Sequence, residues 1–220
     1  MDERRAFAPY FPMWDQLTEG QKTQIEKRIV HQHADKGTML HQGAADCTGL
    51  ILVEAGQLRT FILSEEGREI TLFRLFDRDM CLLSAPCVFH SIQFEVMIAA
   101  EADTDFWVIS AEDYQVIMAE SAPLANFTNE LMATRFSEVM WLLEQILWKG
   151  MDSRVAGLLL SEAAVQEADT LTITHETLAS HLGTHREVVT RMLRYFQEEG
   201  LVRLSRGKIQ LLDRSGLERI

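Results

Sequence analysis

The stretch of sequence that decides the fold lies near the carboxyl end of the chain and reads THETLASHLGTHREVVTRMLRYFQEEG (residues 174–200). Up to Leu182 it has the apolar spacing of a short amphipathic helix, and Gly183 supplies a turn. Residues 184–187 have the form of a capping box, which starts a second helix that ends at Gly200. Helix, glycine turn and helix in this order predict a helix-turn-helix motif.

The residues that follow predict a β wing. Two short apolar runs, at 201–204 and 209–212, flank the polar turn residues SRGK at 205–208. This pattern is typical of a hairpin, and it places two cations, Arg206 and Lys208, at the hairpin tip. A hairpin behind the second helix completes a winged helix-turn-helix.

The first turns of the second helix concentrate side chains that can read the major groove of DNA. Arg186 and Arg191 can each donate two hydrogen bonds to guanine, and Glu187 can accept one from cytosine N4. The alternative, a small helical bundle with a solvated charged face, does not explain this concentration. We therefore predict a DNA-binding domain.

The balance of charge indicates where DNA would be contacted. The chain has 33 acidic and 21 basic residues, a net charge of −12 and an apolar fraction of 47%. Residues 151–220 hold 10 acidic and 9 basic residues, so −11 of the net charge falls on the first 150. Residues 184–208 hold six basic and three acidic residues, a local excess of +3. Because an acidic body repels nucleic acid, we expect DNA contacts to be confined to this basic segment.

Other features of the sequence limit the class of protein to which the chain can belong. The amino terminus shows no secretory signal, and no run approaches the ~18 consecutive apolar residues that span a bilayer. Three cysteines, an odd number, favour a reducing cytoplasm over a disulfide framework. The chain lacks a Cys-x-x-Cys pair, a nucleophile elbow and a phosphate loop. We therefore predict a cytoplasmic protein that is not an enzyme and has no membrane partner.

The first half of the chain has the residue pattern of β strands. From residue 37 to 109, short β-branched or aromatic runs are separated by turn residues. These runs lie at residues 50–53, 58–63, 70–76, 92–100 and 106–109. Their spacing is typical of a small antiparallel roll or barrel, and capping signals at Thr18 and Ser110 predict short helices before and after it. The chain as a whole is therefore predicted to be α+β.

A long helix is predicted from Pro123 to Lys149. Along one face, apolar residues recur at spacings of 4, 3, 4 and 3, the heptad pattern of a helix that pairs with a second helix. These seam residues are Met132, Phe136, Val139, Leu143 and Ile146. Because Leu124 and Phe127 lie on another apolar face that can pack on the chain's own β domain, the seam predicts a homodimer. The alternative, in which the seam also packs on that β domain, stays open.

The sequence resembles the cyclic-AMP-receptor and fumarate-nitrate-regulator (Crp/Fnr) family of bacterial transcription factors. The runs LGTHREVVTRML at 182–193 and EGLV at 199–202 carry the resemblance, and the order of roll, long helix and wing extends it over nearly the whole chain. It implies a cyclic-nucleotide-binding-like, effector-sensing β-roll in residues 1–120, a dimerisation helix in residues 121–149 and a DNA-binding winged helix-turn-helix in residues 150–220.

By this resemblance the protein is a homodimer that regulates transcription by binding an inverted-repeat operator in double-stranded DNA. The expected DNA-binding residues are Thr184, His185, Arg186, Glu187, Thr190, Arg191, Arg206 and Lys208. The resemblance also allows RNA polymerase as a partner. The alternative is a sensor module whose winged domain binds a protein, and retention on DNA would separate the two.

The predicted effector is not cyclic AMP, because the sensor departs from the family's phosphate-binding pattern. Residues 79–91 read DMCLLSAPCVFHS and contain no glycine, glutamate or arginine, whereas cyclic-nucleotide-binding members use a Gly-Glu pair and an arginine there. A buried cyclic phosphate would then be an unpaired charge. No cysteine precedes Cys47, so the cysteine cluster of iron-sulfur members is missing as well.

Cys81, Cys87 and His90 are the candidate effector-sensing residues in this segment. One alternative makes the cysteines small core residues, since free cysteine is among the most buried residue types. The other makes them a thiol switch or thiolate ligands, with a redox signal or a small molecule as effector. Haem-containing members resemble this chain at Cys81, but Leu83 stands where they have a histidine. The cofactor is left unassigned, and no metal-ligand spacing stands out.

Overall fold

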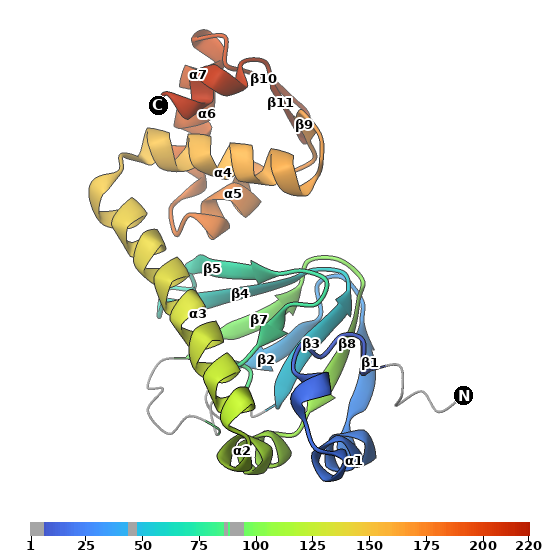
Figure 1. Cartoon of the computed structure of the whole chain (residues 1–220). Helices are drawn as coiled ribbons and strands as arrows, with labels where there is room; N and C mark the ends of the chain where they lie inside the picture. Colours follow the sequence, from blue (N-terminus) through green and yellow to red (C-terminus); the bar gives the residue numbers. More distant parts are fainter. Residues whose placement is uncertain (1–6, 44–47, 86–87, 89–94) are drawn as a thin grey trace. The chain divides into compact units, whose positions relative to one another are not determined.

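The computed structural model describes residues 7–43, 48–85, 88 and 95–220 (Figure 1). The helices are α1 (Glu19–Arg28), α2 (Ala111–Glu120), α3 (Ala122–Trp148), α4 (Met151–Val165), α5 (His175–His181), α6 (Arg186–Glu198) and α7 (Arg214–Glu218), with a 3-10 helix η2 (Trp14–Gln16). The strands are β1 (Val30–Ala34), β2 (Met39–Gln42), β3 (Leu50–Ala55), β4 (Leu58–Leu63), β5 (Glu69–Leu75), β6 (Met80–Cys81), β7 (Met97–Ala100), β8 (Thr104–Ile109), β9 (Thr170–Leu171), β10 (Val202–Ser205) and β11 (Lys208–Leu211).

The chain divides into two units. Met1–Ile62 and Leu72–Val139 form the first, and Leu63–Thr71 and Met140–Ile220 form the second. Strands β1 to β8 make two four-stranded sheets with the strand orders β1-β8-β3-β6 and β2-β7-β4-β5, and their described pairs are antiparallel. This architecture confirms the predicted α+β class with an antiparallel roll.

Strand β3 shows why the roll appears in the sequence as apolar runs. Leu50 and Leu52 pack with the helices in one core cluster, whereas Ile51 and Val53 pack with the second sheet in another. Successive side chains of a strand point to opposite faces. Because both faces of this sheet are covered, all four side chains are buried and the run is continuously apolar.

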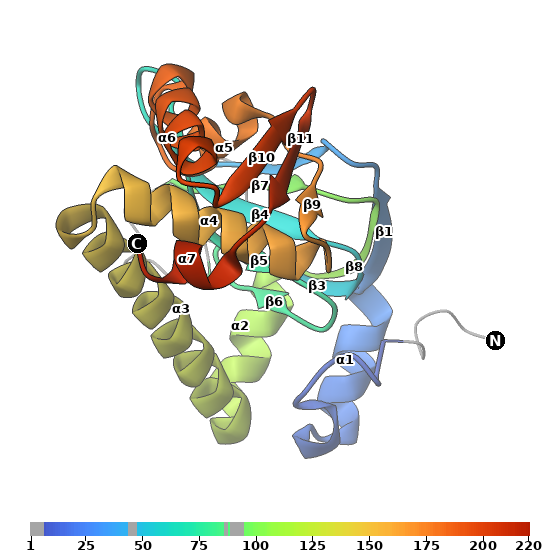
Figure 2. The ribbon, with the colours of Figure 1, turned by 90° about the horizontal axis from the view of Figure 1, so that it is seen from above.

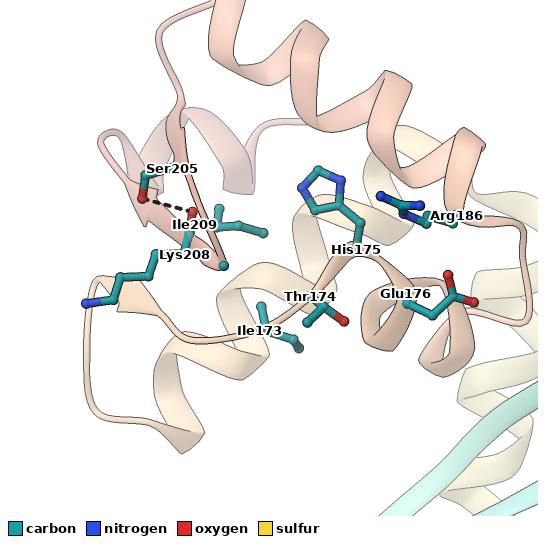
Figure 3. A pocket seen from close by; sticks show the side chains of 9 residues that line it. Ile173, Thr174, His175, Glu176, Arg186, Ser205, Lys208 and Ile209 are labelled. Atoms are coloured by element: carbon teal, nitrogen blue, oxygen red, sulfur yellow. Dashed lines mark hydrogen bonds between the residues drawn. The ribbon is translucent and has the colours of Figure 1, made fainter.

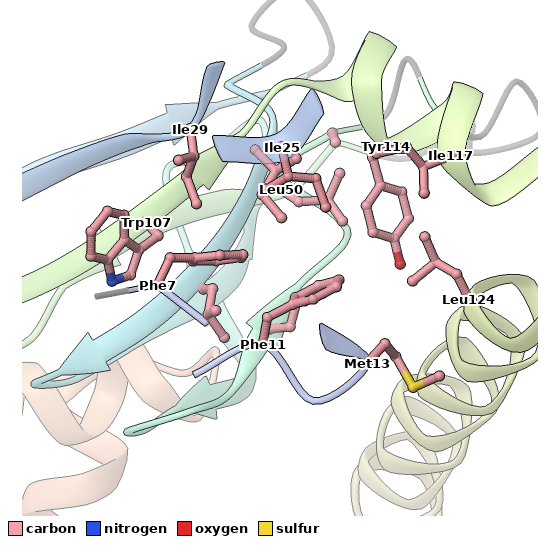
Figure 4. Close-up of a cluster of buried hydrophobic side chains, with 14 of the residues drawn as sticks. Phe7, Phe11, Met13, Ile25, Ile29, Leu50, Trp107, Tyr114, Ile117 and Leu124 are labelled. Carbon is pink, nitrogen blue, oxygen red and sulfur yellow. The ribbon is translucent and has the colours of Figure 1, made fainter. Parts of the chain in front are cut away.

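The cluster on the helix side fixes the start of the long helix α3 (Figure 4). Phe7 stacks on Phe11 with 5.4 Å between ring centroids, and the Trp107 ring lies 5.8 Å from that of Phe7. The hydroxyl of Tyr114 on α2 lies 2.6 Å from Thr128 Oγ1 on α3, and burial raises the pKa of Tyr114 to about 12. The Tyr114–Thr128 contact and the buried Leu124 join the first turns of α3 to this cluster.

Strand β1 lies outside the predicted β region, which began at residue 37. It pairs with β8 from Val30 opposite Val108 to Ala34 opposite Thr104. Four of its five residues are exposed, so the segment VHQHA lacks the apolar alternation that identifies a half-buried strand. The predicted caps Thr18 and Ser110, by contrast, are confirmed, because each side-chain oxygen accepts a backbone amide of its helix.

The second unit packs α4, α5, α6 and α7 with a three-stranded sheet of order β10-β11-β9 around a hydrophobic core. Figure 2 shows the β10–β11 hairpin close to α6. The turn between α5 and α6 is made by Gly183, whose φ of +65° lies in the left-handed region that favours glycine. Helix, glycine turn, helix and hairpin confirm the predicted winged helix-turn-helix.

The predicted capping box at residues 184–187 is wrong. Helix α6 begins at Arg186, and its N-cap residue His185 makes no side-chain capping hydrogen bond. Thr184 belongs instead to the end of α5, where its amide donates to the carbonyl of Ala179 at 3.0 Å. This bond closes the Schellman turn that ends α5. Thr184 is therefore part of that turn, and the N-cap position of α6 falls on His185.

Candidate nucleic-acid interface

Helix α6 has one face in the core and one face in solvent. Its fully buried side chains are Val189, Leu193 and Phe196. Arg186, Glu187 and Arg191 are exposed. Residues four apart lie about 40° apart around a helix, so Glu187 and Arg191 share one strip of its surface. Arg194, which was not among the predicted site residues, is exposed three residues further along the same strip.

The structure places six of the eight predicted DNA-binding residues in solvent. These exposed residues are His185, Arg186, Glu187, Arg191, Arg206 and Lys208. Thr184 and Thr190 are partly buried. Thr184 is held in the turn after α5, and the hydroxyl of Thr190 is engaged with His175, so both are less accessible to a base edge than the charged residues.

The wing presents its cations at a tight turn. Strands β10 and β11 pair with Ser205 opposite Lys208. Gly207 in the turn has a φ of +70°, which a residue with a Cβ atom adopts at a cost. Arg206 and Lys208 are both exposed to solvent at this turn, so they are accessible to the phosphates of DNA.

A hollow of about 490 Å³ lies between α5, the start of α6 and the wing (Figure 3). Its polar side chains are those of Thr174, His175, Glu176, Arg186, Ser205 and Lys208. Two cations and one carboxylate give this lining a net charge of +1 when the histidine is neutral. The hollow is therefore suited to an anion.

His175 is a site residue that sequence reasoning missed. Its Nδ1 atom lies 3.0 Å from Thr190 Oγ1. Partial burial, together with the charges of Arg186 and Arg194, lowers the pKa of His175 below its ordinary value of 6.5. The two hydrogen-bonded residues are 15 positions apart and meet only because α5 crosses α6, so periodicity within either helix carried no signal of the pair.

The predicted seam on α3 is only partly covered within the chain. Phe136 is 67% and Leu143 is 43% exposed, whereas Val139 and Ile146 are partly buried. Met132 packs against both clusters of the roll. Further large apolar side chains exposed on α3 are Met140, Trp141, Leu147 and Trp148. Among the described residues no helix has the length and apolar character to cross a bilayer.

Of the three candidate sensing residues, Cys81 is described, whereas Cys87 and His90 lie outside the described residues. Cys81 lies on β6 and is 1% exposed in the cluster between the sheets. Burial raises the pKa of its thiol. The described part of the chain holds no group of three His, Cys, Asp or Glu side chains placed to bind a metal ion.

Cys81 is expected to resist alkylation in the folded protein. The thiolate is the reactive form, so the raised pKa and the lack of exposure both slow the reaction. Iodoacetamide at pH 8, followed by mass spectrometry of peptides, should leave Cys81 unmodified until urea is added. Rapid labelling of Cys81 in the native protein would contradict its assignment to the core.

Comparison with known proteins agrees with this geometry. The family model of the Crp-like helix-turn-helix domain matches residues 153–220. A crystal structure of a transcriptional regulator of the Crp/Fnr family from Eubacterium rectale is 64% identical, covers 96% of this chain and 98% of that chain, and has a TM-score of 0.94. The cyclic AMP receptor protein of Thermus thermophilus is 29% identical over 78% of each chain, and the probable transcriptional regulator flp of Lacticaseibacillus casei is 26% identical over 94% of each.

The fold and these matches define a transcriptional regulator with a helix-turn-helix DNA-binding domain. The chain belongs to the Crp/Fnr family. The family resemblance seen in residues 182–193 and 199–202 is thereby confirmed.

Proposed function

We propose that the protein is a homodimeric, sequence-specific regulator in which residues 150–220 bind an inverted-repeat operator. The observation that carries this proposal is the exposed strip of α6 with Glu187 and Arg191, beside Arg186. A guanidinium holds guanine O6 and N7 through two hydrogen bonds, and a carboxylate accepts from cytosine N4. The wing cations Arg206 and Lys208 are assigned to phosphates.

The dimer is proposed to form through α3, within residues 121–149. The exposed side chains of Phe136 and Leu143 support this assignment, because apolar surface of this kind is covered when two such helices pair. A two-fold dimer presents two copies of α6. Its half-sites therefore lie about one helical turn of DNA, roughly 34 Å, apart.

The roll, residues 1–120, is proposed to sense an effector other than cyclic AMP. The sequence of residues 79–91 lacks the arginine and the glycine-glutamate pair that would hold a cyclic phosphate. Within the described part of the first unit, two buried polar atoms, Thr60 Oγ1 and Arg135 Nε, have no hydrogen-bond partner. Each such atom costs about 1–3 kcal/mol. A bound molecule with an acceptor group placed against either atom would offset that cost.

The proposed function is tested by selecting bound duplexes from a library of randomised DNA. Full-length protein, with and without the small-molecule fraction of a cell extract as a source of effector, is expected to enrich an inverted repeat with G·C pairs in each half-site. Enrichment of single half-sites would contradict the dimer. If no sequence were enriched in either condition, the protein-binding alternative for the winged domain would replace the DNA-binding one.

A further inference from the structure

His175 lies in the hollow between α5, α6 and the wing, and neither the base contacts proposed for α6 nor the phosphate contacts proposed for the wing involve it. The side chain is partly buried and lines the hollow together with Arg186 and Lys208. Figure 3 shows the ring between Arg186 on one side and the wing residues Ser205 and Ile209 on the other. It is therefore placed to meet whatever anion enters the hollow.

The hydrogen bond to Thr190 determines which ring atom is available. Nδ1 lies 3.0 Å from Thr190 Oγ1, and this bond orients the ring. The remaining nitrogen, Nε2, is the atom that can face a ligand. A neutral imidazole has one donor, whereas a protonated imidazole donates from both nitrogens and can keep its bond to Thr190 while it binds an acceptor.

The charges that face His175 come from three elements. Arg186 and Arg194 lie on α6, Glu176 lies on α5, and Lys208 lies on β11. In the free protein, partial burial and the charges of the nearby arginines lower the pKa of His175 and disfavour the imidazolium form. An anion in the hollow has the opposite effect, because it stabilises the imidazolium.

We propose that this hollow binds a backbone phosphate of DNA and that His175 takes up a proton from solvent as the phosphate enters. The proton adds to the ring nitrogen that carries none in the free protein, so that both nitrogens then donate, Nε2 to a phosphate oxygen and Nδ1 to Thr190 Oγ1. No covalent bond of the DNA changes, and the net charge of the lining rises from +1 to +2. The inference rests on the proposed DNA-binding function and adds to it a phosphate contact that depends on pH.

The sign of the pH dependence follows from this uptake. Protonation is favoured in the complex and disfavoured in the free protein, so DNA affinity increases as pH falls. The slope is at most about tenfold per pH unit for each DNA-binding domain, and it is confined to the range between the lowered pKa of the free ring and the raised pKa of the bound ring.

The experiment measures proton uptake by calorimetry with the full-length protein and a duplex enriched in the selection described above. Titrations at pH 6.5 in two buffers of different ionisation enthalpy give the number of protons taken up per subunit. We expect a net uptake of protons by the wild type, because the pKa of His175 is lowered in the free protein and raised by the phosphate in the complex. His175→Gln places an uncharged amide where the ring was, so this variant should still bind the duplex. It should take up no proton at this position, and its Kd should change less between pH 6.0 and 7.5 than that of the wild type.

Two further variants show whether the effect belongs to His175. His33→Gln removes an exposed histidine of the roll and should leave the uptake unchanged. Uptake that persisted in His175→Gln, or that disappeared only in His185→Gln, would overturn the inference. A wild-type protein that bound none of the selected duplexes at any pH would instead contradict the proposed function, so the two failures are distinguishable.

Discussion

Leu143→Glu is expected to make the protein monomeric at concentrations where the wild type is a dimer. Leu143 is 43% exposed in the single chain, so the substitution leaves the protomer's own core intact. In a two-fold dimer paired through α3 it would bury two carboxylates without partners, at about 3–5 kcal/mol each. We expect dimer affinity to fall by at least about a hundredfold. Light scattering and analytical ultracentrifugation measure this directly.

Ser137→Glu is the matched control for that variant. Ser137 is also exposed on α3, but it lies about 120° around the helix from Leu143. It should remain dimeric and keep its affinity for the operator, whereas Leu143→Glu should bind only half-sites, and weakly. If Leu143→Glu stayed dimeric, the interface would have to lie elsewhere on the molecule.

Arg191→Ala is expected to lose both affinity and base preference. Arg191 lies on the exposed strip of α6, and a bidentate contact to guanine contributes about 1–3 kcal/mol of discrimination. Two half-sites double the effect to about 2–6 kcal/mol, which is roughly 30-fold or more in Kd. Fluorescence anisotropy with operators substituted at each position should show the preference relaxed at one base pair in each half-site.

Lys208→Ala provides the comparison for Arg191→Ala. A phosphate contact carries no base information, so this variant should weaken all duplexes alike and reduce the salt slope by about one per subunit. If Arg191→Ala also left every relative affinity unchanged, the docking of α6 in the major groove would be wrong.

Local signals explain why the winged domain was predictable from the sequence. Gly183 marks the left-handed turn, and Val189, Leu193 and Phe196 follow the helical period that buries them. The spacing of residues along one helix likewise places Glu187 and Arg191 on one strip of its surface. These features depend on residues close in sequence, so no knowledge of the rest of the fold was needed.

Features that depend on distant residues were not predictable in the same way. Strand β1 is polar because most of its side chains are exposed, and only its pairing with β8 makes it a strand. His175 acquires its role from Thr190 on another helix. Met132 fits the heptad period of the seam, but its side chain packs against both core clusters of the roll. The α6 cap was misplaced because the preceding turn takes up Thr184.

The uninterrupted length of α3 has a mechanical consequence. The helix runs for 27 residues, about 40 Å, and its first turns are fixed to the roll by Leu124 and by the hydrogen bond between Tyr114 and Thr128. A rigid rod held at one end acts as a lever. Val139, the last residue of α3 in the first unit, lies about 17 Å beyond Thr128, so a tilt of only about 5° at the anchored end displaces it by about 1.4 Å. Sub-ångström repacking around Tyr114 is therefore amplified along α3 into a shift of about 1 Å or more in the part of the seam that holds Phe136 and Val139.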